Sequence, residues 1–152
     1  MILYRFSPKQ FSSNISGEGA RMHGGRWNSK GIAALYTSLN ISLALLELLI
    51  HSTSHEEISN NQLTVIETTE NNFDEIHISR LKHNWETDDD YCKFIGDEFL
   101  KAKNTLLLKV PSAIISQEAN IIINPTHKNF NKIKIAAIKP FHFDIRLFKH
   151  QS

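Results

Sequence analysis

The stretch from residue 41 to residue 50, ISLALLELLI, restricts the fold more than any other part of the chain. It has apolar residues on every face of a helix, and Glu47 is its only charged residue. Asn40 or Ser38 is a candidate N-cap for such a helix. We therefore predict a largely buried helix over residues 41–52.

Glu47 needs a physical explanation, because helical spacing places its carboxylate in the middle of an apolar stripe. A carboxylate in that position pairs with a cation, takes a raised pKa, or opens onto a cavity. A structural bridge to an arginine and a ligand site both fit this pattern. Perturbed charges are general markers of functional sites, which keeps the second interpretation open.

A second motif, GGRWN at residues 24–28, has the composition of a recognition loop. Its two glycines allow a close approach to the main chain. Arg26 could hold a phosphate or carboxylate with two parallel hydrogen bonds, and Trp27 and Tyr36 offer flat faces to a ring. The alternative is that Arg26 forms a surface ion pair and Trp27 belongs to the core.

Length and composition are those of one globular domain, which we expect to span residues 1–152. The net charge of +1 predicts no strong attraction to nucleic acid or to an acidic membrane. One cysteine, Cys92, excludes an internal disulfide and fits a reducing compartment. The chain shows no secretory signal and no apolar run of membrane-spanning length, so we expect a cytoplasmic protein.

The periodicity predicts many strands and two main helices that do not alternate regularly, which indicates an α+β fold with a mixed or antiparallel sheet. Besides residues 41–52, a helix is expected over residues 88–102, with Tyr91, Phe94, Ile95, Phe99 and Leu100 on its core face. Residues 9–31 are expected to form a long loop, and residues 76–81 a strand or irregular chain. Asp144 and Arg146 are expected to pair on the last strand. Strands are predicted over residues 2–6, 32–37, 63–69, 106–110, 120–124, 133–138 and 141–148.

Other chemistries find little support in the sequence. His51 and His55 are four residues apart, as zinc ligands on a helix can be, but no third ligand is evident. The acidic residues 88–90 lack the glycine and distal glutamate of a calcium loop and fit the first turn of a helix with Thr87 as its cap. Ser112 follows a proline and has no flanking glycines, which disfavours a hydrolase nucleophile. We therefore expect no metal.

Several short blocks occur in the order of the RES domain, and together they span nearly the whole chain. That family is named for an arginine, a glutamate and a serine, which here correspond to Arg26, Glu47 and Ser112. The sequence departs from the family at residues 29–30, where Ser-Lys replaces a frequent proline. The blocks are Tyr4-Arg5, SGEGA at 16–20, GGRWN at 24–28, Tyr36, LLE at 45–47, VPSA at 110–113, NP at 124–125 and PFHFDIRL at 140–147.

The resemblance implies the toxin of a bacterial type II toxin–antitoxin pair, neutralised by an Xre-type helix-turn-helix antitoxin. It also implies an ADP-ribosyltransferase-like fold and NAD as the substrate, cleaved at the nicotinamide–ribose bond by hydrolysis or phosphorolysis. By the same resemblance, Arg26, Tyr36 and Glu47 would be catalytic. Residues that would bind NAD are Arg5, Arg26, Trp27, Asn28 and Ser112.

Two alternatives to an NAD-cleaving enzyme remain at this stage. The first is an ADP-ribosyltransferase that uses the same residues and differs only in its acceptor, a protein. The second is a non-catalytic nucleotide-binding module in which Arg26 and Glu47 form a buried bridge, whose disruption would be strongly destabilising.

Overall fold

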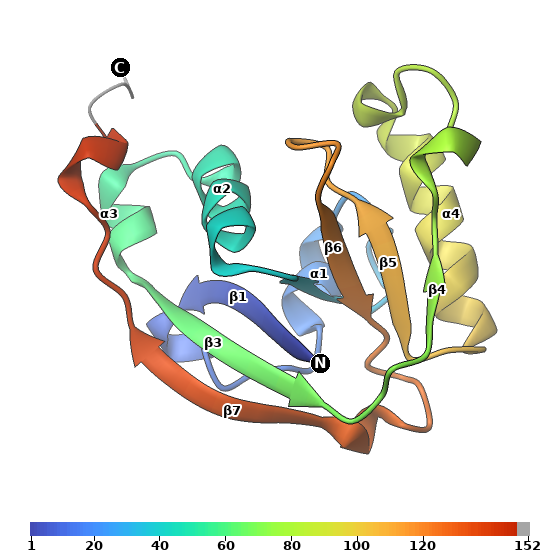
Figure 1. Ribbon diagram of the computed structural model, residues 1–152, viewed down its shortest axis with the longest axis horizontal. Coiled ribbons are helices and arrows are strands. Elements are labelled where there is room, and N and C mark those ends of the chain that lie inside the picture. Colours follow the sequence, from blue (N-terminus) through green and yellow to red (C-terminus); the bar gives the residue numbers. More distant parts are fainter. Residues whose placement is uncertain (149–152) are drawn as a thin grey trace.

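A seven-stranded sheet forms the centre of the protein in the computed structural model, which describes residues 1–148 (Figure 1). The strand order is β4-β5-β6-β2-β1-β3-β7, and every neighbouring pair is antiparallel except β4–β5, which is parallel. The predicted α+β fold with a mixed sheet is thus confirmed. The strands are β1 (Ile2–Pro8), β2 (Leu35–Ser38), β3 (Asn61–Thr68), β4 (Phe73–Glu75), β5 (Leu107–Pro111), β6 (Ala119–Ile123) and β7 (Ile133–Pro140).

The sheet is weakly joined between β1 and β2. Those two strands share a single registered pair, Tyr4 with Ser38, whereas β1 pairs with β3 along its whole length. Figure 1 shows the consequence: the antiparallel strands β1, β3 and β7 lie along a similar axis, and β4, β5 and β6 stand almost across them. The two halves of the sheet diverge from this seam.

Two longer helices have the capping residues that helix starts favour. In α2 (Ile41–His51) the Asn40 side chain accepts a hydrogen bond from the Leu43 amide at 2.7 Å. In α4 (Asp89–Ala102) the Asp88 carboxylate accepts one from the Tyr91 amide at 3.0 Å. The shorter helices are α1 (Glu18–His23) and α3 (His55–Ser59), with 3-10 turns η1 (Lys9–Phe11), η2 (Ile78–Arg80), η3 (Trp85–Thr87), η4 (Phe130–Lys132) and η5 (Ile145–Phe148).

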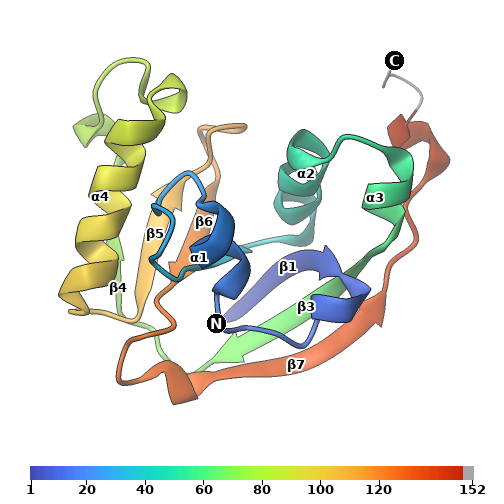
Figure 2. The same cartoon turned by 180° about the vertical axis from the view of Figure 1, so that it is seen from behind.

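The helices lie on different parts of the sheet. α2 packs against β1 and β2 and so lies across the seam, while α4 runs beside β4 and β5 (Figures 1 and 2). Alternating residues of β5 and β6 build a core on each face of this half, with Leu107 and Ile121 on one side and Leu108 and Ile122 on the other. None of the helices described within residues 1–148 combines the length and the apolar character that crossing a bilayer requires.

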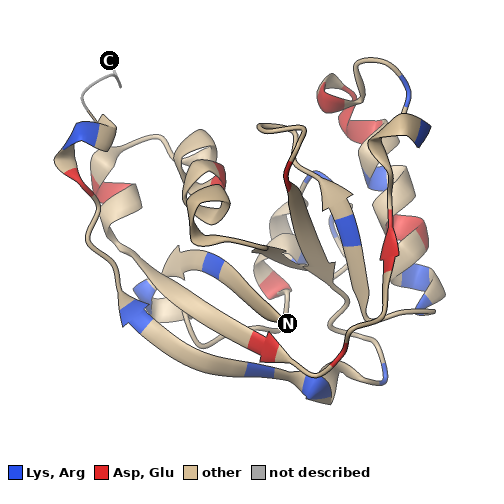
Figure 3. Cartoon of the chain, in the orientation of Figure 1, with Lys and Arg blue, Asp and Glu red and all other residues tan. Residues whose placement is uncertain are grey.

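The prediction that α2 is largely buried was wrong. Only Leu43 and Ala44 are buried, and the Ile50 residue is 64% exposed. The helix packs against β1 and β2, and the two residues that it buries are one turn from its start. The single acidic segment of α2 appears in Figure 3 on an otherwise uncharged helix.

The predicted strand over residues 141–148 was also wrong. β7 ends at Pro140, and the chain continues without a ladder partner into η5. Phe141 and Phe143 nevertheless pack on Phe6, with ring centroids 4.9 and 5.6 Å away, so the alternation reflected packing without strand pairing. Asp144 and Arg146 form the expected ion pair, at 2.9 Å, beside η5.

Smaller differences concern short elements and one helix face. The expected loop over residues 9–31 contains η1 and α1, residues 76–81 contain η2, and neither α3 nor β4 was predicted. Phe94 is 66% exposed and does not belong to the core face of α4. The other predicted residues do belong to it: Leu100 is buried, and Tyr91, Ile95 and Phe99 are partly buried against the same core. The helix also buries Cys92, Gly96 and Asp97. The last four residues of the predicted domain lie outside the described residues.

Candidate functional site

A cleft of about 380 Å³ opens at the seam between β1 and β2. Its walls come from both strands, from one face of α2, from the GGRW part of the loop after α1, and from the ends of β5 and β6. The volume falls within the range of pockets for small molecules. The weak pairing of β1 with β2 is what leaves this space open.

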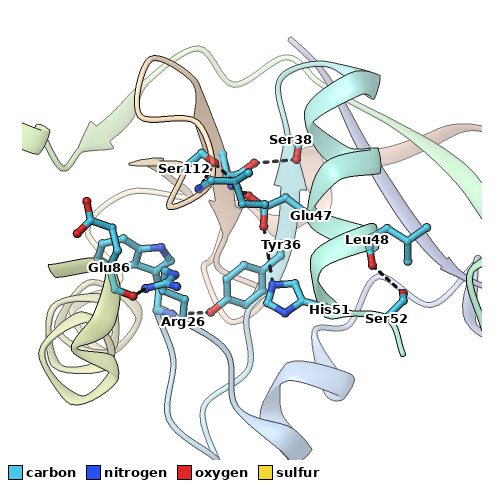
Figure 4. A network of polar contacts seen from close by, with 12 residues as sticks. Arg26, Tyr36, Ser38, Glu47, Leu48, His51, Ser52, Glu86 and Ser112 are labelled. Atoms are coloured by element: carbon cyan, nitrogen blue, oxygen red, sulfur yellow. Dashed lines mark hydrogen bonds and ion pairs between the residues drawn. The ribbon is translucent and has the colours of Figure 1, made fainter. Parts of the chain in front are cut away.

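Glu47 projects from α2 toward the cleft, with its side chain 27% exposed (Figure 4). One carboxylate oxygen, Oε1, accepts hydrogen bonds from Asn120 Nδ2 at 2.7 Å and from Ser112 Oγ at 3.3 Å. The other oxygen, Oε2, has no hydrogen-bond donor within the described part of the chain, and His51 Nε2 lies 3.8 Å from it. One oxygen is therefore fixed by the protein and the other faces the cleft.

Asn120 was not selected from the sequence, yet it is the closest partner of Glu47. Its Oδ1 accepts a hydrogen bond from Ser38 Oγ at 2.7 Å, so the amide orientation is set from both sides. Ser38 and Asn120 are registered opposite each other on β2 and β6. The sequence showed only a polar amide at the start of an otherwise apolar strand. That this amide contacts Glu47 depends on the strand register, which the sequence does not show.

Ser112 lies beneath the cleft and is only 1% exposed. Its Oγ donates to Glu47 and accepts from the backbone amides of Ile114 and Ile115, both at 3.1 Å. Those contacts stabilise the turn after β5 and support the carboxylate. Ser112 itself is not among the residues that line the cleft.

Arg26 lies at the far side of the Tyr36 ring from His51 in Figure 4. Its NH1 donates to the Glu86 carbonyl at 2.9 Å, and its guanidinium lies 5.8 Å from the centre of the Trp85 ring. Arg26 and Glu47 form no ion pair with each other; among the residues described, neither has a carboxylate or guanidinium partner of that kind. Arg26 lines the cleft without a carboxylate partner among the described residues.

Tyr36 both lines the cleft and holds the recognition loop. Its hydroxyl accepts a hydrogen bond from the Trp27 amide at 2.9 Å and donates one to Asn28 Oδ1 at 2.7 Å. Burial raises the pKa of Tyr36 above its ordinary value, so the phenol stays protonated and can donate. A Cβ on Gly25 would lie 2.6 Å from this hydroxyl, which explains a glycine there.

Trp27 and Asn28 lie within the protein. Trp27 is 2% exposed and packs 5.8 Å from Trp85, although part of it borders the cleft. Asn28 is fully buried, and its Nδ2 donates to the carbonyls of Ala20 at 2.8 Å and Ile32 at 2.9 Å. Asn28 does not line the cleft, and its contacts fix the shape of the loop.

Helix α4 anchors the same loop from the other side. Asp97 accepts hydrogen bonds from the amide and the hydroxyl of Ser29, the first at 2.8 Å. Lys93 Nζ donates to the Gly25 carbonyl at 2.9 Å. Ser29 stands where the family often has proline, and its two hydrogen bonds to Asp97 hold this part of the loop against α4.

Arg5, on β1, is the second guanidinium that lines the cleft. Its NH1 donates to the Asn14 carbonyl at 2.8 Å, and no carboxylate among the described residues pairs with it. Burial lowers the pKa of Arg5, because desolvation disfavours its charged form. A partly desolvated cation with free donors is suited to an anionic ligand.

His51 and His55 do not share a helical face. The first ends α2 and the second begins α3. Within residues 1–148, no group of three or more histidine, cysteine, aspartate or glutamate side chains is arranged to hold a metal ion.

The fold and site together define a class, an α+β protein with a carboxylate and two arginines at an open sheet seam, and comparison with known proteins identifies the family. The RES domain model matches residues 2–144. The chain therefore belongs to the RES domain family.

Its relatives are toxins. It is 36% identical to Toxin Res of Yersinia enterocolitica over 97% of this chain and 99% of that protein. It is 37% identical to Toxin Res of Photorhabdus laumondii over 98% of both chains. A Prs ADP-ribosylating toxin of a Sphingobium species is 30% identical over 91% of this chain and 89% of that toxin.

A solved structure supports the fold. The crystal structure of the M. tuberculosis MbcT–MbcA toxin–antitoxin complex contains a chain that superposes with a TM-score of 0.74. The match covers 90% of this chain and 81% of that one at 16% sequence identity. At this identity the likeness concerns the fold.

Proposed function

We propose that this RES toxin cleaves NAD at the bond between nicotinamide and ribose. The observation that carries the proposal is the state of Glu47: one oxygen is held by Asn120 and Ser112, and the other faces a cleft bordered by two arginines. A carboxylate arranged in this way is suited to a reaction that develops positive charge on a sugar.

The chemistry requires one carboxylate. Nicotinamide in NAD is already a cationic leaving group, so its departure needs no general acid, in contrast to ordinary glycoside hydrolysis with its two carboxyl groups. Glu47 Oε2 would accept a hydrogen bond from a ribose hydroxyl and stabilise the positive charge that grows on the ribose. Such stabilisation is strongest where the charges are fixed in advance and water is restricted.

The arginines supply the opposite charge. Arg26 and Arg5 line the same cleft and have donors that carboxylates of the described chain do not occupy. We assign the pyrophosphate of NAD to them, because guanidinium groups bind phosphate oxygens through paired hydrogen bonds. Tyr36 offers its ring to the nicotinamide, and Trp27, Asn28 and Ser112 hold the loop and the carboxylate in place.

The acceptor of the ADP-ribose distinguishes two candidate activities. Water or phosphate would make the protein an NAD-degrading enzyme, and a protein side chain would make it an ADP-ribosyltransferase. The relative named as an ADP-ribosylating toxin favours the second. Both share the first step, the loss of nicotinamide, so Glu47 has the same role in each.

The test is incubation of the purified protein with NAD, with and without phosphate, followed by identification of the products. We expect free nicotinamide from the parent protein. Glu47→Gln keeps the shape of the side chain but removes its charge, and should lower turnover by roughly 10²-fold or more. Glu67→Gln is the matched control, because Glu67 is an exposed carboxylate on β3 away from the cleft.

Equal NAD consumption by the parent and Glu47→Gln would contradict the proposal. Thermal melting of both proteins separates lost chemistry from lost folding. Labelled NAD added to a cell lysate would then show whether the ADP-ribose ends on protein or remains free, which decides between the two activities.

We also propose an antitoxin partner of the Xre helix-turn-helix type and a cytoplasmic site of action, where an uncontrolled NAD-cleaving enzyme would poison its own cell. A toxin–antitoxin complex is the form in which the structural relative was solved. Co-expression with the product of the neighbouring gene should restore growth, and the inactive Glu47→Gln protein should still co-purify with it.

A further inference from the structure

We propose that His51 is the base that removes the proton from the acceptor when water or a hydroxyl group attacks the ribose. The inference rests on the proposed function and deepens it. His51 is the last residue of α2, one turn after Glu47, and its ring borders the cleft beside the Tyr36 ring (Figure 4). Its Nε2 is 3.8 Å from the free Oε2 of Glu47.

Glu47 is poorly suited to take this proton itself. Its Oε1 already accepts two hydrogen bonds, and its Oε2 is the oxygen that the proposed function assigns to the ribose. If Glu47 accepted the proton, it would lose its negative charge while the sugar cation still needs it. A separate base keeps the carboxylate charged throughout the step.

The cleft offers few other candidates. Its titratable side chains are Tyr4 and Arg5 on β1, Arg26 on the loop, Tyr36 on β2, and Glu47 and His51 on α2. Arginines do not give up their protons in proteins, and phenols are protonated near neutral pH. The Tyr36 hydroxyl is moreover engaged with Trp27 and Asn28. Imidazole is the group that both accepts and releases a proton near neutrality.

The position of His51 gives the proton a route away from the cleft. His51 is the last residue of α2, and its Nε2 lies 3.8 Å from Glu47 Oε2. The side chain is 74% exposed, so its proton can pass to solvent.

The reaction balances with this assignment. The bond between ribose C1′ and the nicotinamide nitrogen breaks, and its electron pair leaves with neutral nicotinamide. The acceptor oxygen forms the new bond to C1′, and its proton moves to His51 Nε2 and then to solvent. With water the products are ADP-ribose, nicotinamide and one proton.

The test compares acceptors in His51→Gln, which keeps a polar group but does not take up a proton. Hydrolysis should fall by roughly 10²-fold, the usual size of a general-base contribution. Phosphorolysis should be nearly unchanged, because a phosphate dianion attacks through an oxygen that carries no proton. The measured quantity is the ratio of ADP-ribose to its phosphate ester at saturating phosphate. His55→Ala is the matched control, as an exposed histidine outside the cleft.

A pH profile and chemical rescue separate a base from a structural residue. Hydrolysis by the parent should decline as the pH falls through the range in which imidazoles gain a proton, and His51→Gln should lack this decline. Added imidazole should restore hydrolysis to His51→Ala, because the exposed site admits it. Both effects are absent if His51 only stabilises the end of α2.

The outcomes distinguish this inference from the function on which it rests. A parent protein that releases no nicotinamide overturns both. A parent that cleaves NAD while His51→Gln keeps its product ratio and pH profile overturns the role of His51 and leaves that of Glu47 intact. A parent that uses phosphate alone, with His51→Gln unaffected, also overturns it.

Discussion

Asn120 is the side chain that most directly sets the orientation of Glu47. It donates to Oε1 at 2.7 Å and is itself held by Ser38 at 2.7 Å. In Asn120→Ala, Glu47 keeps only the longer contact from Ser112, at 3.3 Å. A hydrogen bond to a charged group contributes about 1.5–3 kcal/mol, so NAD turnover should fall by roughly 10- to 100-fold.

The measurement is kcat and KM for NAD together with the melting temperature. We expect the loss mainly in kcat, because a mobile carboxylate weakens stabilisation of the developing cation more than ground-state binding. Asn104→Ala is the control, since Asn104 is exposed and lies after α4. A variant that melts normally and turns NAD over at the parental rate would refute the positioning role of Asn120.

The GGRWN motif shows how far a local sequence pattern predicts the role of a single residue. The GGRWN pattern pointed to a recognition loop, and Arg26 does border the cleft. Asn28 belongs to the same motif, but its partners are the carbonyls of Ala20 and Ile32 and the hydroxyl of Tyr36. Local sequence does not distinguish a side chain that faces a ligand from one that shapes the loop, because the difference depends on where neighbouring segments fold.

Helix α4 acts at the scale of elements as the support of this loop. Gly96 faces the Trp27 carbonyl so closely that a Cβ there would lie 1.7 Å from the oxygen. Gly96→Ala should therefore push α4 from the loop and destabilise the protein by about 1–3 kcal/mol or more, as overpacking does. NAD cleavage should decline as well, because the displaced loop carries Arg26.

Gly19→Ala, on α1, is a sharp control for this change. No atom within 4 Å would meet its Cβ, and the residue is helical. The substitution should be neutral or stabilising by about 0.4–1 kcal/mol, since alanine restricts the unfolded chain. Denaturant unfolding measures both variants, and an unchanged midpoint for Gly96→Ala would contradict the tight contact between α4 and the loop.

Elements were predictable from the sequence where local signals sufficed. Both long helices begin beside polar residues that the sequence displays. α2 starts after the candidate cap Asn40, whereas α4 is capped by Asp88 and not by Thr87, the residue before it that we expected. The short α1, α3 and β4 give too few residues for a periodic pattern. Residues 141–148 alternate like a strand because Phe141 and Phe143 pack on Phe6, but Pro140 and the missing partner strand leave them without a ladder.

At the scale of the whole molecule, the site depends on a discontinuity in the sheet. Its residues come from β1, β2, α2, the loop after α1 and the ends of β5 and β6, and the single pair between β1 and β2 leaves the space in which they meet. The sequence showed the residue types of the site and the resemblance to the RES domain family. It contained no direct sign of the seam, because strand order and register are set by contacts between distant segments.

Basic residues lie on one edge strand of the sheet. β7 is an edge strand, and Lys134 and Lys139 lie on it before Pro140 (blue in Figure 3). Lysines and a proline on an edge oppose pairing with a second chain. These basic residues therefore have a structural explanation, and the net charge of +1 gives no reason to assign them to nucleic acid.

Because the cleft lies at the seam, a ligand bound in it should join the two halves of the sheet and stabilise the whole fold. In Glu47→Gln, ADP-ribose at about 100 times its Kd should add about 2.7 kcal/mol. For a domain of this size that corresponds to a rise in Tm of roughly 5–10 °C. Hydrogen exchange should slow in β1, β2 and α2 together.

Arg5→Gln in the same background should reduce the shift in Tm, because one cation for the pyrophosphate is lost. A Tm that stays unchanged during an ADP-ribose titration would show that the folded protein does not bind this ligand, and protection of only one side of the seam would place the ligand elsewhere.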